Sequence, residues 1–298
     1  MLVNKQTLGA IFTNIKTTFN KAFEAAPSKW QQIAMRVPST TSQNDYTWLN
    51  NFPKMRRWIG AKHIKSLGAH KYTLVNDPFE ATIGIHKHDI ADDNIGFIGP
   101  QSEGAGYSAK QWPDELVFEA VNQGTSQICH DGQYFFDTDH EVGDESVSNK
   151  FTLPLDISSQ AAAKASYGAV RTAMKLYKDD EGRPLNVTPN ILLVGPALED
   201  TANTLMTADR LEDGKPNPYK GTATVVVDAR IANDTDWYLL DTTKPILPFI
   251  FQDREKPQMM ALTDITSDHV FSLGEFLFGC EARGQGGYGF WQLAAKGN

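Results

Sequence analysis

Residues 76–94 read NDPFEATIGIHKHDIADDN. Polar or small residues separate the apolar positions in the first half of this stretch, which are Phe79, Ala81, Ile83 and Ile85. A period of two is typical of a β-strand with one buried face. Asn76–Pro78 is typical of a turn, and Lys71–Val75 is a second extended run. The region is therefore predicted to form a long β-hairpin.

The second half of the stretch is rich in residues that bind metal ions. His86 and His88 would point to the same face of a strand, and an aspartate could supply a third ligand. The cluster nevertheless matches no ligand pattern of fixed spacing, such as HExxH. We expect exposed strand residues that run into a helix, with acids in its first turn at Asp89, Asp92 and Asp93.

Charge is strongly segregated around this hairpin. The chain has 298 residues, with 28 Lys and Arg against 36 Asp and Glu, which gives a formal net charge of −8. The segment from Tyr46 to Asn76 has no acid, and its bases are Lys54, Arg56, Arg57, Lys62, Lys65 and Lys71. Binding of nucleic acid by the whole surface is disfavoured, since phosphates need clustered bases. A basic hairpin on an acidic protein instead indicates a contact between protein chains.

Two helices are predicted in the first half of the chain outside this region. The first has one apolar face, made of Leu8, Ile11, Phe12, Ile15 and Phe19. It either covers the protein's own core or reaches a neighbouring subunit. After residue 94, four glycines and Pro100 predict a poor helix. A better helix is expected to begin at Trp112–Pro113 and to end at Gly124.

The second half mixes helices and strands. A helix is predicted over 158–178, capped by Ser158 or Ser159, with a buried stripe at Ala163, Tyr167, Val170, Met174 and Tyr177. A buried strand at Ile191–Val194 precedes a helix from Pro196 to Met206. Runs rich in β-forming residues follow at 222–231, 237–241, 248–252 and 270–284. No regular βαβ period is present, so the predicted fold class is α+β.

Residues 129–140 read CHDGQYFFDTDH and form a second cluster of candidate ligands. The chemically active side chains are Cys129, His130, Asp131, Asp137, Asp139 and His140. Catalysis would require closeness in space, which sequence does not give. We expect a turn at Asp131–Gly132 and an apolar plug at 134–136. Cys129 and Cys280 form no CxxC pair, so that neither a disulfide framework nor a thiolate zinc site is indicated, as suits a reducing cytoplasm.

Several segments together resemble one family, the major head subunits of Mu-like phages and prophages. They lie in order along almost the whole chain and read APSKWQQIAM, YTWLNNFPKMRRWIG, GIHKHDIADDN, CHDGQYFFDTDH, PNILLVGPALEDTA, PFIFQDREKP and GEFLFGCEARGQGGYGFWQLA. The resemblance implies the Hong Kong 97-type capsid fold. The implied parts are an N-terminal arm (1–30), an extended β-hairpin loop (53–88), a peripheral domain with a spine helix (31–52, 89–150 and 266–285) and an axial domain (151–265 and 286–298). The glycines and Pro100 predict that the spine helix is kinked or short.

The function implied by the resemblance is that of a major capsid protein. Such a protein self-assembles, as hexamers and pentamers, into an icosahedral head that encloses phage double-stranded DNA without sequence-specific binding. The implied location is the virion, after assembly in the host bacterial cytoplasm. Scaffold, portal and decoration proteins are the implied further partners. The resemblance implies no catalytic residue, cofactor, metal site or membrane contact.

Intersubunit contacts are expected in the basic hairpin. The side chains expected to lie over an acidic surface of an adjacent subunit, such as 137–145, are Arg56, Arg57, Lys62 and Lys65. Exposed ion pairs would set register and partner choice more than strength. The expected apolar anchors are Trp48, Phe52 and Trp58.

Two other functions remain open from the residues alone. A metal-dependent hydrolase would use His86, His88, His130, Asp131 or His140, and a stoichiometric bound metal would favour it. A small soluble binding module would stay a monomer or dimer, whereas a shell protein forms particles of very high mass. The sequence has no P-loop, GxSxG elbow or signal-peptide pattern, and no run of about 18 apolar residues that would suit a membrane span.

Overall fold

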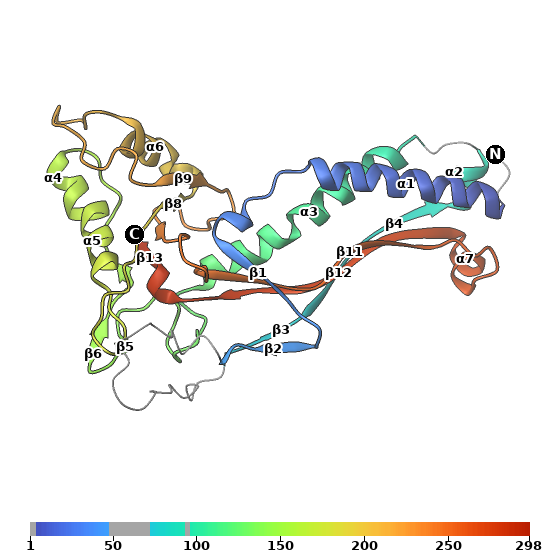
Figure 1. Ribbon diagram of the computed structural model, residues 1–298. Helices are drawn as coiled ribbons and strands as arrows, with labels where there is room; N and C mark the ends of the chain where they lie inside the picture. The colour runs from blue at the N-terminus through green and yellow to red at the C-terminus, as the bar shows by residue number, and fades with distance from the viewer. Residues whose placement is uncertain (1–3, 48–71, 93–95) are drawn as a thin grey trace.

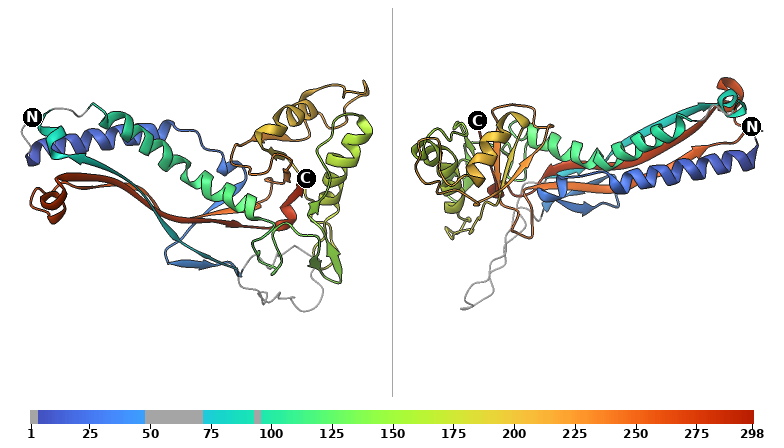
Figure 2. Two further views of the ribbon diagram at one scale, coloured as in Figure 1. Left: turned by 180° about the vertical axis from the view of Figure 1, so that it is seen from behind. Right: turned by 90° about the horizontal axis from the view of Figure 1, so that it is seen from above.

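The computed structural model describes residues 4–47, 72–92 and 96–298. The chain forms a long arm joined to a compact lobe (Figure 1). The long arm contains residues 5–38, 77–91, 98–123 and 249–288, and the lobe is built mainly from residues 150–240 and 291–297. Figure 2 shows from two further directions that helices α1 and α3 run along the sheet of the arm. Helices and sheets are mixed, which confirms the predicted α+β class. Among the described helices, none has both the length and the apolar character needed to cross a bilayer.

The sheet of the arm has the strand order β1-β11-β12-β4. Its strands are β1 (Ala34–Pro38), β11 (Phe249–Leu262), β12 (Glu275–Tyr288) and β4 (Asp77–His86). β1 is parallel to β11, and the other neighbours are antiparallel. Exposed and partly buried positions alternate along β4 and end at the buried Ile85, which confirms the predicted period-two strand.

Helix α1 (Lys5–Ala25) carries the predicted apolar face toward its own chain. Leu8, Ile11 and Ile15 are buried in one cluster with Ile85 of β4 and Phe278 of β12. The amphipathic helix is confirmed, and the core that it covers is that of the arm.

Helix α3 (Ile98–Gln123) is one continuous helix of 26 residues. The expected short helix, and the separate helix starting at Trp112–Pro113, are therefore wrong, while the predicted end at Gly124 is confirmed. Tertiary packing overrides the low propensity, because a Cβ on Gly106 would lie 2.4 Å from the carbonyl oxygen of Phe19. Glycine thus lets α1 pack closely on α3. Pro100 falls in the first turn, where a missing N–H removes no intrahelical bond.

The predicted pairing of 71–75 with 79–86 is wrong. β2 (Gln43–Asp45) pairs with β3 (Thr73–Val75), and β4 pairs with β12. Asn76 carries the chain from β3 into β4 without a hairpin turn, and its buried amide donates to Ser39 Oγ and the carbonyl of Thr41. The range 53–88 therefore does not form a single hairpin where it is described. Alternation identifies a strand but not its partner.

The short helix α2 (Lys87–Ala91) follows β4. His86 is its N-cap and Asp89 lies in its first turn, as predicted. Asp92 is the C-cap residue instead, so the expectation of an acid at the helix start is wrong there. Asp93 lies outside the described residues.

The lobe is built on the sheet β7-β13-β10-β8-β9. Its strands are β7 (Lys150–Phe151), β13 (Ala294–Gly297), β10 (Trp237–Leu240), β8 (Ile191–Val194) and β9 (Thr224–Val227). Its helical segments are α4 (Gln160–Ala163), the π-helical turn η3 (Lys164–Gly168), α5 (Ala169–Leu176), η4 (Pro196–Leu198) and α6 (Glu199–Thr207). Ser159 caps α4, and all five predicted stripe residues are buried. The helix and strand predictions for 158–207 are confirmed.

Two features near the C-terminus bear on the expected domains and strands. The assignment of 151–265 to an axial domain stays a prediction, and β11 within this range pairs along β12 in the sheet of the arm. The run 270–284 was expected to be all strand, but it begins inside helix α7 (Asp268–Leu273). Gly274 ends α7 in the left-handed conformation, with φ 71°, and β12 starts directly after it.

Candidate functional site

The first His- and Asp-rich stretch lies at the distal end of the arm, beside α2 (Figure 1). His86 ends β4 and His88 lies in α2. The expectation that the two share one face of a strand is therefore wrong. Their rings stack with centroids 4.9 Å apart. In the described ranges, one group of three or more potential ligands converges on a common point, and it includes neither histidine.

That group is Cys129, Asp131 and His140, whose ligand atoms all lie within 4.8 Å of one another. The Cys129 thiol donates to Asp131 Oδ1 at 3.0 Å, and His140 Nδ1 lies 2.7 Å from Asp131 Oδ2. The predicted turn is present, with Gly132 at φ 90°. The predicted apolar plug is confirmed for Phe135 and Phe136. The structure thus joins three residues that are spread over the 129–140 stretch.

His140 is fully buried at the start of β5 (His140–Val142), which pairs with β6 (Glu145–Val147). Its ring stacks on Trp291 of η5 (Trp291–Leu293), with centroids 3.9 Å apart. Its Nε2 lies 3.2 Å from Asn149 Oδ1. The same oxygen accepts the N–H of Asp137, and Asn149 Nδ2 donates to the carbonyl of Phe135. The orientation of this amide is therefore set by its backbone partners.

The electrostatics of the cluster do not suit a nucleophile. Burial alone would raise the pKa of Asp131, but hydrogen bonds from His140 and Cys129 hold it well below its ordinary value. Burial, and then the Asp131 charge, raise the pKa of the Cys129 thiol far above its usual range. A reactive cysteine needs the opposite shift. Burial lowers the pKa of the neighbouring His130 to about 4, and its Nδ1 has no hydrogen-bond partner in the described part of the chain.

The basic and aromatic contact residues predicted from sequence, 48–65, lie outside the described residues. The acidic surface that they are expected to contact, 137–145, lies within the described residues. The β5–β6 hairpin exposes Glu141, Asp144 and Glu145. This hairpin projects from the lobe in Figure 1.

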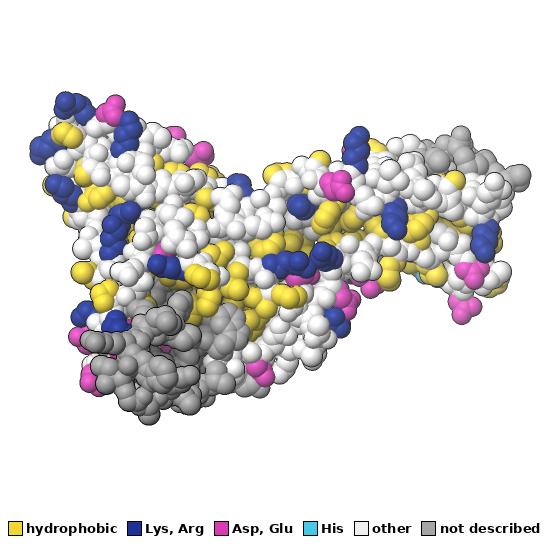
Figure 3. All heavy atoms as spheres, viewed as in Figure 1, with side chains coloured by type: hydrophobic (Ala, Val, Ile, Leu, Met, Phe, Trp, Pro, Cys, Tyr) yellow, Lys and Arg dark blue, Asp and Glu magenta, His cyan; other side chains and the backbone are white. Residues whose placement is uncertain are grey.

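A distal apolar patch at the end of the arm was missed from the sequence. We define it by its exposed side chains Met260, Leu262, Ile265, Phe271 and Leu273. Phe271 is 89% exposed and Leu273 is 59% exposed. Figure 3 shows further hydrophobic side chains along the arm, with Lys and Arg between them. The sequence signal that could have revealed α7 is its two capping residues: Ser267 caps the start of the helix and Gly274 ends it.

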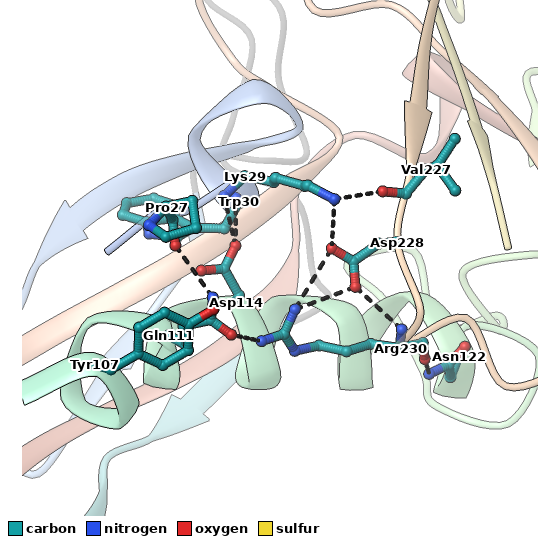
Figure 4. A network of polar contacts seen from close by, with 10 residues as sticks. All are labelled: Pro27, Lys29, Trp30, Tyr107, Gln111, Asp114, Asn122, Val227, Asp228 and Arg230. Carbon is teal, nitrogen blue, oxygen red and sulfur yellow. Dashed lines mark hydrogen bonds and ion pairs between the residues drawn. The ribbon is translucent and has the colours of Figure 1, made fainter. Parts of the chain in front are cut away.

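A polar network joins the arm to the lobe (Figure 4). Asp114 of α3 accepts the N–H groups of Lys29 and Trp30 at 2.7 and 2.8 Å. Lys29 Nζ lies 3.5 Å from Asp228, which also pairs with Arg230 at 3.1 Å.

The network continues along α3. Arg230 donates to the side chain of Gln111 at 2.5 Å, and Asn122 donates to the carbonyl of Arg230 at 2.7 Å. Three segments that are distant in sequence therefore meet: the link after α1, the middle of α3 and the end of β9.

Comparison with known proteins finds close relatives over almost the whole chain. The family model described as Mu-like prophage major head subunit gpT matches residues 8–153, 155–231 and 226–298. The major capsid protein of Escherichia phage Mu is 33% identical over 294 residues, which are 99% of this chain and 74% of that protein. The Mu-like prophage FluMu major head subunit of Haemophilus influenzae is 30% identical and covers 98% of this chain and 73% of its own length.

Solved structures resemble the chain in the same way. The procapsid protein of bacteriophage JBD30 is 30% identical with a TM-score of 0.63, over 99% of this chain and 75% of that one. A JBD30 capsid decorated with minor capsid protein trimers is 30% identical with a TM-score of 0.61, over 72% of this chain and 93% of that one. A virus-like particle from Pyrococcus furiosus shares the fold at 10% identity, with a TM-score of 0.57 over 96% of this chain and 99% of that one.

Proposed function

Since the chain belongs to the Mu-like prophage major head subunit gpT family and is a major capsid protein of a phage head shell, we propose which of its surfaces build that shell. The expected family and the Hong Kong 97-type fold are both confirmed. The hydrolase alternative finds no support, because the relatives are capsid proteins. We propose a structural role, without turnover of a substrate.

We propose that copies of the chain associate as hexamers and pentamers around double-stranded DNA. A closed shell repeats heterologous contacts, so each copy presents different surfaces to different neighbours. Assembly takes place in the host bacterial cytoplasm with a scaffold and a portal. The decorated JBD30 capsid supports a decoration partner for this chain as well.

The distal apolar patch is the observation that carries the proposed contact between copies. Monomeric proteins rarely keep several large apolar side chains exposed together. Burying a phenylalanine such as Phe271 contributes about 1.5–3 kcal/mol, and a shell repeats this contribution at every copy. We propose that the patch packs against a sister copy.

Replacing Phe271 and Leu273 by serine tests this contact. We expect the yield of assembled particles to fall by roughly tenfold or more, since about 1.4 kcal/mol per contact is a factor of ten. Both side chains are exposed, so the unassembled subunit should keep its melting temperature. Particles are counted by electron microscopy and their mass is measured by light scattering.

The matched control is Phe271→Leu, which keeps the patch apolar and should assemble normally. Wild-type particle yield from the double serine variant, with the same folded fraction, would remove the patch from the assembly surface.

A second contact remains a proposal from the sequence: Arg56 and Arg57 face the acidic β5–β6 hairpin of an adjacent copy. Replacing both by glutamate should reduce particle yield, because like charges then meet. Adding Glu141→Lys and Glu145→Lys to the same chain should restore it. Particle counts by electron microscopy decide: unchanged yield in the first variant contradicts the proposal, and failed rescue contradicts the choice of partner surface.

A further inference from the structure

Two neighbours fix the orientation of the His140 ring. Asn149 turns its side-chain oxygen toward His140 Nε2, because that oxygen also accepts a backbone N–H while its Nδ2 donates to carbonyl groups. Nε2 is therefore the ring nitrogen that faces an acceptor oxygen. His140 Nδ1 then faces Asp131 Oδ2 at 2.7 Å. A nitrogen lone pair and a carboxylate oxygen repel at this distance unless a cation lies between them. That cation is either a proton or a metal ion.

The cluster brings a third donor to the same place, the sulfur of Cys129. We propose that Cys129 Sγ, the Asp131 carboxylate and His140 Nδ1 form a structural zinc site. Sulfur, imidazole nitrogen and carboxylate oxygen are the ligand types of protein zinc sites. A thiolate ligand disfavours magnesium and calcium, which prefer oxygen.

The surroundings of the three ligands support a metal. A metal-bound histidine usually donates its second N–H to a fixed acceptor, as His140 does to Asn149. Asp131 Oδ1 is held by the N–H of Gln133 at 3.1 Å. These three side chains leave one position of a tetrahedron for water.

Zinc binding requires a small rearrangement and releases protons. Ligand atoms of a tetrahedral zinc with bonds near 2.1 Å lie about 3.4 Å apart, so Asp131 and His140 would separate by about 0.7 Å. The thiol proton of Cys129 and the proton between His140 and Asp131 leave to solvent. No redox step is involved.

A metal at this place would fix the loop after α3 to β5. Through Asn149 and Trp291, which contact His140, it would also hold the C-terminal segment of the lobe. Ligands that bind only the folded state raise its melting temperature. The proposed role of the metal is therefore structural, and its ligand His140 begins the β5–β6 hairpin.

Metal content of the full chain tests the proposal. Protein purified in reducing buffer without chelators is expected to hold about one zinc per chain by elemental mass spectrometry. Cys129→Ser and His140→Gln should weaken zinc binding by about 100-fold or more. The matched control is Cys280→Ser, which changes the other buried cysteine, in β12, and should keep the metal.

Cobalt(II) gives a second, spectroscopic readout. A sulfur-to-cobalt charge-transfer band in wild-type protein, lost on adding zinc and retained in Cys280→Ser, would support the site. Absence of stoichiometric metal, of the cobalt band and of any rise in melting temperature with zinc would overturn it. The cation between His140 and Asp131 would then be a proton.

Discussion

Asp114 shows how one buried acid holds a distant part of the chain. It is 1% exposed, and its Oδ1 accepts two backbone N–H groups, from Lys29 and Trp30. Asp114→Ala should lower the free energy of unfolding by roughly 2–4 kcal/mol, because two buried donors lose their acceptor. Urea denaturation of the unassembled subunit measures the change. Asp114→Asn keeps an oxygen in place and should lose much less; equal losses in both variants would contradict this role.

Long-range contacts of single buried side chains were the hardest feature to predict from the sequence. Asp114 follows Pro113, and that pair looked like the start of a helix, with the acid near the positive end of the dipole. The structure places the acid inside α3, bound to a segment about 85 positions earlier. The cluster of Cys129, Asp131 and His140 was equally hidden, since its spacing follows no standard ligand pattern and its closeness depends on the β5–β6 fold.

At the scale of elements, two glycines in α3 test why this helix is continuous. A Cβ on Gly106 would meet Phe19 of α1, whereas a Cβ on Gly104 would meet nothing within 4 Å. Gly104→Ala should therefore stabilise the unassembled subunit by about 1 kcal/mol through helix propensity. Gly106→Ala should destabilise it, because α1 must move away. Thermal melts of the two variants check the signs; a gain in both would show that α1 packing does not require Gly106.

Elements were predictable where their own periodicity decides them. The apolar faces of α1, β4 and the α4–α5 segment point inward as the spacing indicates, although three of the four apolar positions of β4 are only partly buried. Pairing was not predictable, because the partners in β4 and β12 are about 190 to 207 residues apart (from 275 − 86 to 284 − 77) and each strand would have the same pattern beside another partner. Likewise α3 contradicts its propensity, since close contact with α1 selects glycine at Gly106.

At the scale of the whole molecule, the arm and the lobe must keep one relative orientation in every copy of a shell. The two meet at the network around Asp228, which is 3% exposed. Arg230 contributes most there, because it bonds both Asp228 of the lobe and Gln111 of α3. Lys29 supplies a second, longer pair to the same carboxylate. The junction shares one hydrophobic core with both parts, and these charge-assisted bonds add geometrically specific contacts to it.

Arg230→Met tests whether this network sets the shape of the subunit. Lys29 still neutralises Asp228, so we expect the unassembled chain to lose only about 1 kcal/mol of stability. The link to Gln111 is lost, however, and copies with varying angles should close into particles of mixed diameter, measured by cryo-electron microscopy. Arg183→Met is the matched control, because Arg183 pairs with Asp179 and Glu181 within the lobe. A single diameter class in both variants would show that the angle is set by contacts between copies instead.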